Sequence, residues 1–216
     1  MTFFDLALQT SVALPPCGEP SEFVSEYVGL IRKHTEDGGK ITPVGKIKAL
    51  YVHVDLAMDE RVSLYDVCDD HSDELHRLHR RFFERNTYDL KESLTRQFDA
   101  IPCDLLVIDY VALDPKWRRL KLGLLAVRQL IDLLGAGCGL VVSEILPLSP
   151  HAPKLLKIPR SWVPVHKSKD ELGKATKKLR QYFRQVGFER VGRSAYYALA
   201  VSRLATPAAD LLKSSQ

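Results

Sequence analysis

Residues 105–123 read LLVIDYVALDPKWRRLKLG, and this stretch decides the fold. Its first part, 105–113, is an apolar run of strand length, which predicts a buried strand. A basic loop follows at 114–121, and from 123 to 134 apolar residues recur at helical spacing. The sequence therefore predicts a strand that leads into a helix through a short basic turn.

The turn has the features of an anion site. The first amides of a helix have no partner within the helix, and the helix dipole places positive charge at the same end. Arg118, Arg119 and Lys121 add charges that suit phosphate. We interpret the turn as a phosphate-binding site. An ordinary turn with solvated basic residues is the alternative, because the lone Gly123 is a weak motif.

The segments on either side complete an α/β pattern. The connection that follows the second buried strand is long and contains five prolines, so we expect it to cover one side of a substrate cleft. In chain order, the sequence predicts a strand at 47–56, a helix at 63–83, a helix from 89, the central strand and helix, a strand at 140–145, the connection at 146–167, a helix from Ser168 to Val186 and a closing strand at 193–203.

Residues 1–46 look like an irregular extension, because prolines and glycines interrupt them. One short helix is expected inside it, with Ser21 as the N-cap. We therefore divide the chain into an N-terminal extension at 1–46, a single domain at 47–205 and a frayed tail at 206–216.

Composition narrows the class of protein. The 216 residues are 45% hydrophobic and 27% charged, as in ordinary globular proteins. The net charge of +4 suits an anionic small ligand and does not favour nucleic acid. The sequence predicts neither a membrane span, which needs roughly 18 apolar residues, nor a secretory leader, which needs a basic start. Four separated cysteines predict neither a zinc site nor a disulfide framework. We expect a cytoplasmic protein with no bound metal.

The central stretch also resembles the GNAT superfamily, the acetyl-CoA-dependent N-acyltransferases. Their signature is a strand ending Val-x-Pro-x-Tyr, then Arg/Gln-x-x-Gly-x-Gly/Ala, then a helix. Residues 113–117, LDPKW, and 118–123, RRLKLG, follow this order, with Lys121 in place of the first glycine. A second landmark, an aromatic residue followed by three residues and then Gly-Phe, matches 183–188, FRQVGF. Within this region, 105–148 is similar to a group of uncharacterised bacterial GNAT-like proteins, in which Gly-x-Gly-Leu precedes the fifth strand and Pro-Leu follows it, as at 137–140 and 147–148.

The resemblance implies a GNAT-like α/β fold with a mixed, mostly antiparallel sheet, helices on both faces and a splayed cleft between strands four and five. It implies acetyl-CoA as the acyl donor. The backbone of Val111 and Leu113 on the fourth strand is then expected to pair with the pantetheine arm. The amides expected to hold the pyrophosphate are those of Arg118, Arg119, Leu120, Lys121, Leu122 and Gly123.

Acyl transfer requires a neutral amine and a proton for the thiolate that leaves. Asp109 on the fourth strand and Glu144 near the end of the fifth are the candidate bases. A salt-bridged carboxylate and a charge at the rim are their respective alternatives. Tyr182 is the candidate acid, because Phe183 stands where the family carries a tyrosine. Core packing is the alternative for Tyr182, since it lies on the apolar stripe of its helix.

The function we expect is transfer of an acetyl group from acetyl-CoA to a small-molecule or peptide amine. The alternative is a GNAT-fold protein that binds CoA or regulates another process with little or no catalysis. Lys121 and Phe183, both departures from the family pattern, favour that alternative. We expect no membrane or nucleic-acid partner. The sequence does not identify the acceptor amine, and it leaves a homodimer open.

Overall fold

The computed structural model describes residues 2–11, 18–35, 41–101 and 103–204. In this part of the chain the strands form one sheet in the order β1-β2-β3-β4-β5-β7-β6. Only β4 and β5 are parallel neighbours, and every other pair is antiparallel. The strands are β1 (Thr2–Thr10), β2 (Val24–Thr35), β3 (Thr42–Val52), β4 (Asp104–Leu113), β5 (Cys138–Glu144), β6 (Glu189–Arg190) and β7 (Tyr196–Ala200).

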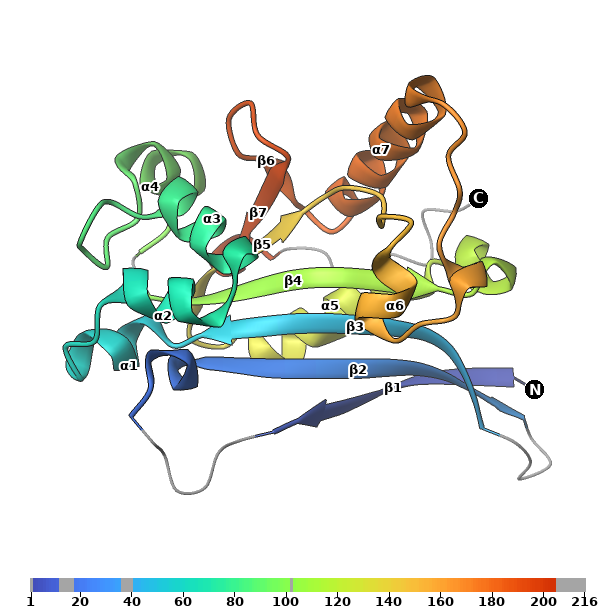
Figure 1. The fold of residues 1–216 in the computed structure, drawn as a ribbon, viewed down its shortest axis with the longest axis horizontal. Coiled ribbons are helices and arrows are strands. Elements are labelled where there is room, and N and C mark those ends of the chain that lie inside the picture. Colours follow the sequence, from blue (N-terminus) through green and yellow to red (C-terminus); the bar gives the residue numbers. More distant parts are fainter. Residues whose placement is uncertain (1, 12–17, 36–40, 102, 205–216) are drawn as a thin grey trace.

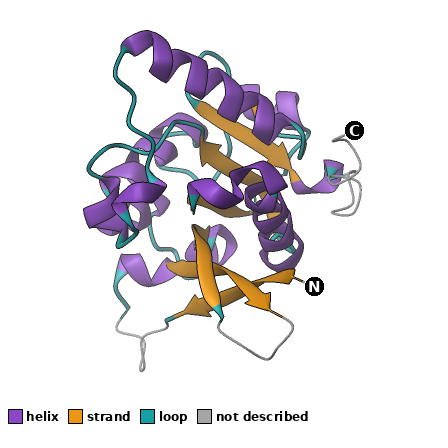
Figure 2. Ribbon diagram, turned by 90° about the vertical axis from the view of Figure 1, so that its right-hand side faces the viewer, coloured by secondary structure: helices purple, strands orange, loops and turns teal. Residues whose placement is uncertain are grey.

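Helices lie on both faces of the sheet (Figures 1 and 2). None of those in the described part is long and apolar enough to cross a membrane. The α-helices are α1 (Val54–Asp59), α2 (Leu64–His71), α3 (Asp73–Phe82), α4 (Glu92–Phe98), α5 (Leu122–Leu134), α6 (Ala152–Leu156) and α7 (Lys169–Arg184). Short 3-10 helices are η1 (Pro20–Phe23), η2 (Pro115–Leu120), η3 (Arg160–Trp162) and η4 (Val201–Arg203).

Two apolar cores sandwich the sheet, and strand β4 contributes to both. Leu105 and Val107 pack with α1–α4 on one face, and Leu106 and Ile108 pack with α5 on the other. Successive side chains of a strand point to opposite faces, so a strand covered on both sides reads as a continuous apolar run. These features confirm the predicted α/β class, the mostly antiparallel sheet and the helices on both faces.

The prediction for the N-terminal segment was wrong. Residues 1–46 are not an irregular extension, because β1, β2 and the start of β3 occupy most of their described part. The short helix expected there is only the 3-10 turn η1, which contains Ser21 and has Glu19 as its N-cap. The strand β2 pairs along its length with β1 and with β3. The apolar spacing after Ser21 therefore marks a strand, and this segment belongs to the same sheet as the rest of the chain.

Two upstream elements also differ from expectation. The single helix predicted at 63–83 is two helices, α2 and α3, separated by Ser72. Ser72 has an extended backbone (φ −172°, ψ 153°), and its hydroxyl accepts the Leu75 N–H at 3.2 Å to cap α3. The predicted strand at 47–56 is displaced, because β3 begins at Thr42 and α1 begins at Val54.

The elements after the central helix lie close to their predicted positions. The Ser168 hydroxyl caps α7 by accepting the Glu171 N–H at 3.2 Å, as the sequence predicts. The closing strand at 193–203 is shorter than expected, because β7 ends at Ala200 and η4 follows it. The tail predicted at 206–216 lies outside the described residues.

Candidate functional site

The parallel strands β4 and β5 pair over only part of their length. Their register ends at Val107 and Val142. One step further, the Ser143 hydroxyl donates a 2.9 Å hydrogen bond to the Ile108 carbonyl. Beyond this point β4 continues to Leu113 with β3 as its partner. The two strands therefore separate after Ile108, and the splay expected between strands four and five is present.

A cavity of about 570 Å³ opens where the strands separate. This volume is within the range of small-molecule binding sites. Its walls come from the free half of β4, the end of β5, the start of α5, one side of α7 and the connection between β5 and α7. We call this cavity the cleft. Among the site residues predicted from the sequence, those that line the cleft are Asp109, Val111, Leu113, Arg118, Gly123, Glu144 and Tyr182.

The start of α5 forms one end of the cleft. Lys121, the N-cap, has a left-handed backbone with φ 54° and ψ 14°. That conformation costs a residue other than glycine roughly 1–2 kcal/mol. Lys121 thus adopts the backbone of a glycine, the residue that the GNAT signature has at this position. A Cβ added at Gly123 would lie 3.2 Å from Leu113 Cδ1 and 3.6 Å from the Tyr182 hydroxyl, so this glycine leaves room in the cleft.

Tyr182 reaches the start of α5 from the opposite wall. Its hydroxyl accepts the N–H of Leu124 at 3.2 Å. A hydroxyl that accepts one hydrogen bond keeps its own proton to donate. Burial raises the pKa of Tyr182, and the bond from Leu124 offsets part of that rise, so the phenol is protonated at neutral pH. The neighbouring Phe183 packs on Phe188 with ring centroids 5.5 Å apart.

The guanidinium of Arg118 is bound within the protein. Its Nε and Nη2 each donate to the Leu113 carbonyl at 3.2 Å, and Nη2 also donates to the Trp162 carbonyl. Burial lowers the pKa of Arg118. These bonds fasten η2 to both β4 and the connection. The side chain therefore shapes the wall of the cleft, and it is less free to follow a ligand than the sequence suggests.

The predicted phosphate-binding range 118–123 meets the cleft at its two ends. Arg118 and Gly123 are the members that line it. The backbone turn between them lies at the surface of the molecule. In that turn Arg119 and Leu120 are exposed, Lys121 is half-buried and Leu122 is buried in the core.

Asp109 is the extra residue of a bulge in β4, where the register with β3 shifts between Lys48 and Ala49. Its carboxylate lies 3.9 Å from Lys48 Nζ, which also pairs with Glu26 at 2.8 Å. Partial burial raises the pKa of Asp109, and Lys48 lowers it in part. Asp109 thus forms the salt bridge that the alternative interpretation predicts. Because its pKa is raised, it is nevertheless a stronger base than an ordinary exposed aspartate.

Glu144 is the last residue of β5, on the other side of the opening. It is exposed and lies opposite Tyr196 of β7 in the register. Burial raises the pKa of Tyr196, and the charge of Glu144 raises it further. Because Asp109 and Glu144 stand on the two strands that separate, one carboxylate flanks each side of the cleft.

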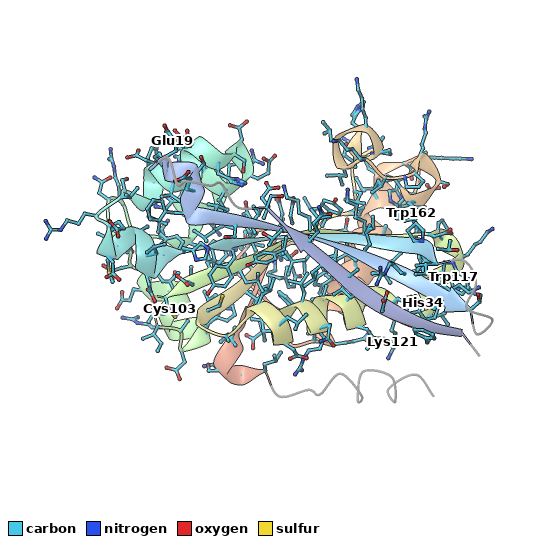
Figure 3. The ribbon with its side chains drawn as sticks, turned by 90° about the horizontal axis from the view of Figure 1, so that it is seen from below. Glu19, His34, Cys103, Trp117, Lys121 and Trp162 are labelled. Carbon is cyan, nitrogen blue, oxygen red and sulfur yellow. The ribbon has the colours of Figure 1, made fainter. Side chains whose placement is uncertain are left out.

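The connection at 146–167 closes the cleft from outside. Trp162 is buried against Tyr110 and Ala112 of β4. Residues 146–148, together with Trp162 and Pro164, line the cleft. Figure 3 places Trp162 at the same end of the molecule as Trp117 of η2. The prediction that 146–167 lie beside the opening between β4 and β5 is confirmed.

His166 is a cleft residue that the sequence analysis missed. It lines the cleft just before α7, and its Nε2 is shielded from solvent with no hydrogen-bond partner among the described residues. The sequence gives little reason to select this residue, because it is a single histidine between Pro164 and the N-cap Ser168 and belongs to no motif. An unpartnered nitrogen on the wall gives the cleft another group that can form a hydrogen bond with a ligand.

No set of three or more His, Cys, Asp or Glu side chains in the described ranges is arranged to hold a metal ion. Comparisons with protein-family models, with curated proteins and with solved structures find no match to this chain. The assignment of function therefore depends on the chemistry of the cleft.

Proposed function

We propose that this protein is a CoA-dependent N-acyltransferase of the GNAT type, with acetyl-CoA as the donor and an amine as the acceptor. One observation carries the proposal. The parallel pair β4–β5 separates after Ile108, and the cleft that opens there ends at the N-terminus of α5. This arrangement offers an anion site and an unpaired strand edge in one continuous cavity. We further infer that the protein acts in the cytoplasm.

The donor fits this cavity by its shape and its polar groups. The positive end of the α5 dipole and its first-turn amides suit the pyrophosphate, apart from the Leu124 N–H, which donates to Tyr182. Past Ile108, β4 has no strand on its β5 side, so its backbone groups at Val111 can pair with the amides of a pantetheine arm. At Leu113, which the resemblance also assigns to pantetheine, the carbonyl already accepts two N–H groups of Arg118. The thioester then lies near the point of separation, between Asp109 and Glu144.

The chemistry needs no group beyond those in the cleft. The amine nitrogen attacks the thioester carbonyl, the carbon–sulfur bond breaks and the thiolate accepts a proton. Asp109, whose pKa is raised, is the better placed of the two carboxylates to take the proton of the amine. Tyr182 holds a phenolic proton that its bond with Leu124 leaves free, so it is the candidate donor to the thiolate.

The second candidate, a protein that binds CoA without turnover, is favoured by one specific observation. Phe183 has no proton to donate, and Tyr182 reaches the cleft one position earlier along the helix. A turnover assay separates the two functions. Purified protein is given acetyl-CoA and a panel of primary amines, and free thiol is measured. Thiol release with at least one amine supports the enzyme. Saturable CoA binding without release supports the binding protein.

A further inference from the structure

A second concave surface lies on the other side of α7 from the cleft. It is a groove of about 510 Å³ between α7 and the strands β6 and β7. The side chains of α7 that line the cleft include Ala175 and Tyr182, whereas those that line the groove include Thr176 and Arg180. Figure 1 shows α7 rising from the end of the sheet where β6 and β7 lie. We call this surface the basic groove.

The basic groove is lined by positive charge. Five of its lining residues are cations and none is an acid: Lys169, Lys177, Arg180, Arg184 and Arg190. None of the five takes part in an ion pair among the described residues. Unneutralised charge of one sign in a concave surface concentrates its field and attracts ions of the opposite sign.

The nearby carboxylates are directed elsewhere. Asp170 pairs with Lys174 at 2.7 Å, and Glu171 accepts the Lys167 N–H at 2.8 Å. Glu189 precedes Arg190 in β6, and successive side chains of a strand point to opposite faces. The positive charge of the groove is therefore left for a ligand that is not part of the described chain.

Arg180 is held in place within the groove. Its guanidinium carbon lies 5.9 Å from the centre of the Tyr197 ring. Its Nε is shielded from solvent and donates to no acceptor in the described residues. A shielded donor without a partner costs free energy until an acceptor arrives. An arginine fixed on an aromatic ring presents its remaining N–H groups with little loss of entropy on binding.

We propose that the basic groove binds a small ligand that carries a chain of at least two phosphate groups. Arginine matches phosphate geometry with two parallel hydrogen bonds, and Arg180 and Arg184 both line the groove. Four residues along a helix span about 6 Å, so the pair suits consecutive phosphates better than one. Tyr197 is buried and Arg180 lies over its ring, so the ring offers no free face on which a base could stack. The phosphate chain itself is the recognised part.

Calorimetric titration with inorganic tripolyphosphate at low ionic strength tests the proposal. We expect a site in the basic groove whose affinity is at least about tenfold above that for orthophosphate. The variant Lys177→Gln/Arg184→Gln removes two exposed cations and should weaken binding about tenfold or more. The charge-matched control Arg80→Gln/Lys154→Gln alters exposed cations elsewhere and should stay within about twofold.

Titrations with other phosphate compounds identify the kind of ligand that supplies the phosphate chain. ATP with the affinity of tripolyphosphate would show that the phosphate chain is sufficient, and tighter binding of ATP would show that a nucleotide is the ligand. A thermal melt checks that the Lys177→Gln/Arg184→Gln variant keeps the fold intact. The proposal is overturned if wild-type protein does not bind tripolyphosphate, if both double variants weaken binding equally, or if a single-stranded oligonucleotide binds more tightly.

Discussion

The Tyr182 hydroxyl lies 3.2 Å from the Leu124 backbone nitrogen and accepts its N–H. This bond joins α7 to the first turn of α5 across one end of the cleft. It places a phenolic proton on the wall of the cleft, next to the start of α5. It also fixes the orientation of the ring, since the oxygen has a defined partner. Tyr182 is therefore part of the cleft wall as well as of the apolar stripe of α7.

Replacement of this hydroxyl tests its role in proton transfer. If Tyr182 protonates the departing thiolate, Tyr182→Phe should lower kcat by roughly 10²–10⁴-fold with little change in CoA affinity. Steady-state kinetics with titration calorimetry measures both. The control Tyr88→Phe removes a hydroxyl that donates to the Val62 carbonyl at 3.1 Å, away from the cleft, and should leave kcat unchanged. Unaltered kcat in Tyr182→Phe would assign the proton donor to water.

A methyl group at Gly123 should obstruct the donor. In Gly123→Ala the new Cβ lies 3.2 Å from Leu113 Cδ1, where the cleft meets α5. We expect CoA to bind about tenfold or more weakly, because the methyl blocks close approach of the backbone. Gly173→Ala is the matched control, since its Cβ meets no atom within 4 Å. It should stabilise α7 by about 1 kcal/mol without altering CoA affinity. Equal CoA affinities in the two variants would contradict the placement of the donor.

Asp109 should lower the stability of the fold at neutral pH while it supports turnover. Its folded pKa is raised, so it contributes stability below its unfolded pKa and loses that contribution as pH rises through the folded value. At pH 7 the ionised carboxylate is therefore a cost, and Asp109→Asn should raise Tm while it reduces turnover. The gain in Tm should shrink in acid below the unfolded pKa of 3.8. Thermal melts at both pH values measure this. A lower Tm at pH 7 would show that the ion pair with Lys48 is net stabilising.

His79 should make the fold sensitive to acid. It is 3% exposed, neither ring nitrogen has a partner among the described residues, and it stacks on Phe83. Burial lowers its pKa, and the charges of His76 and Lys91 lower it further. Its contribution to stability is complete above the unfolded pKa of 6.5 and is lost as pH falls through the folded pKa.

The free energy of unfolding should consequently fall between pH 7 and pH 5, by at most about 1.4 kcal/mol per pH unit from this group. His79→Leu should flatten that slope, whereas the exposed His151→Leu should not. Denaturant melts across the pH range provide the measurement. Parallel slopes in wild type and His79→Leu would assign the acid sensitivity to His53 and His71, whose pKa values burial also lowers.

The central region could be predicted because its signals are local. Strand β4 is buried on both faces, so it reads as a continuous apolar run, and α5 has an unbroken helical stripe. The cleft between β4 and β5 was implied by the resemblance to the GNAT superfamily, and the proline-rich connection indicated what covers it. The roles of the residues that line the cleft could not be predicted. The role of Arg118, for example, depends on a hydrogen bond to the carbonyl of Trp162, 44 residues away.

The wrong predictions for the N-terminal third of the chain have a physical cause. In β2 the apolar residues after Ser21 recur at three and four, which suits a helix, but β1 and β3 each supply a full ladder of backbone hydrogen bonds. Tertiary pairing thus overrides local spacing. The break between α2 and α3 was hidden in the same way, because an apolar stripe continues through Ser72 even though its hydroxyl caps a new helix.

CoA binding is the measurement that tests the account most directly. Titration calorimetry of wild-type protein with CoA, together with thermal melts, reports occupancy of the cleft. We predict one CoA per chain and a stabilisation of about 2.7 kcal/mol at a hundredfold excess over Kd. No heat of binding and an unchanged Tm at millimolar CoA would contradict the assignment of the cleft between β4 and β5 as an acyl-CoA site.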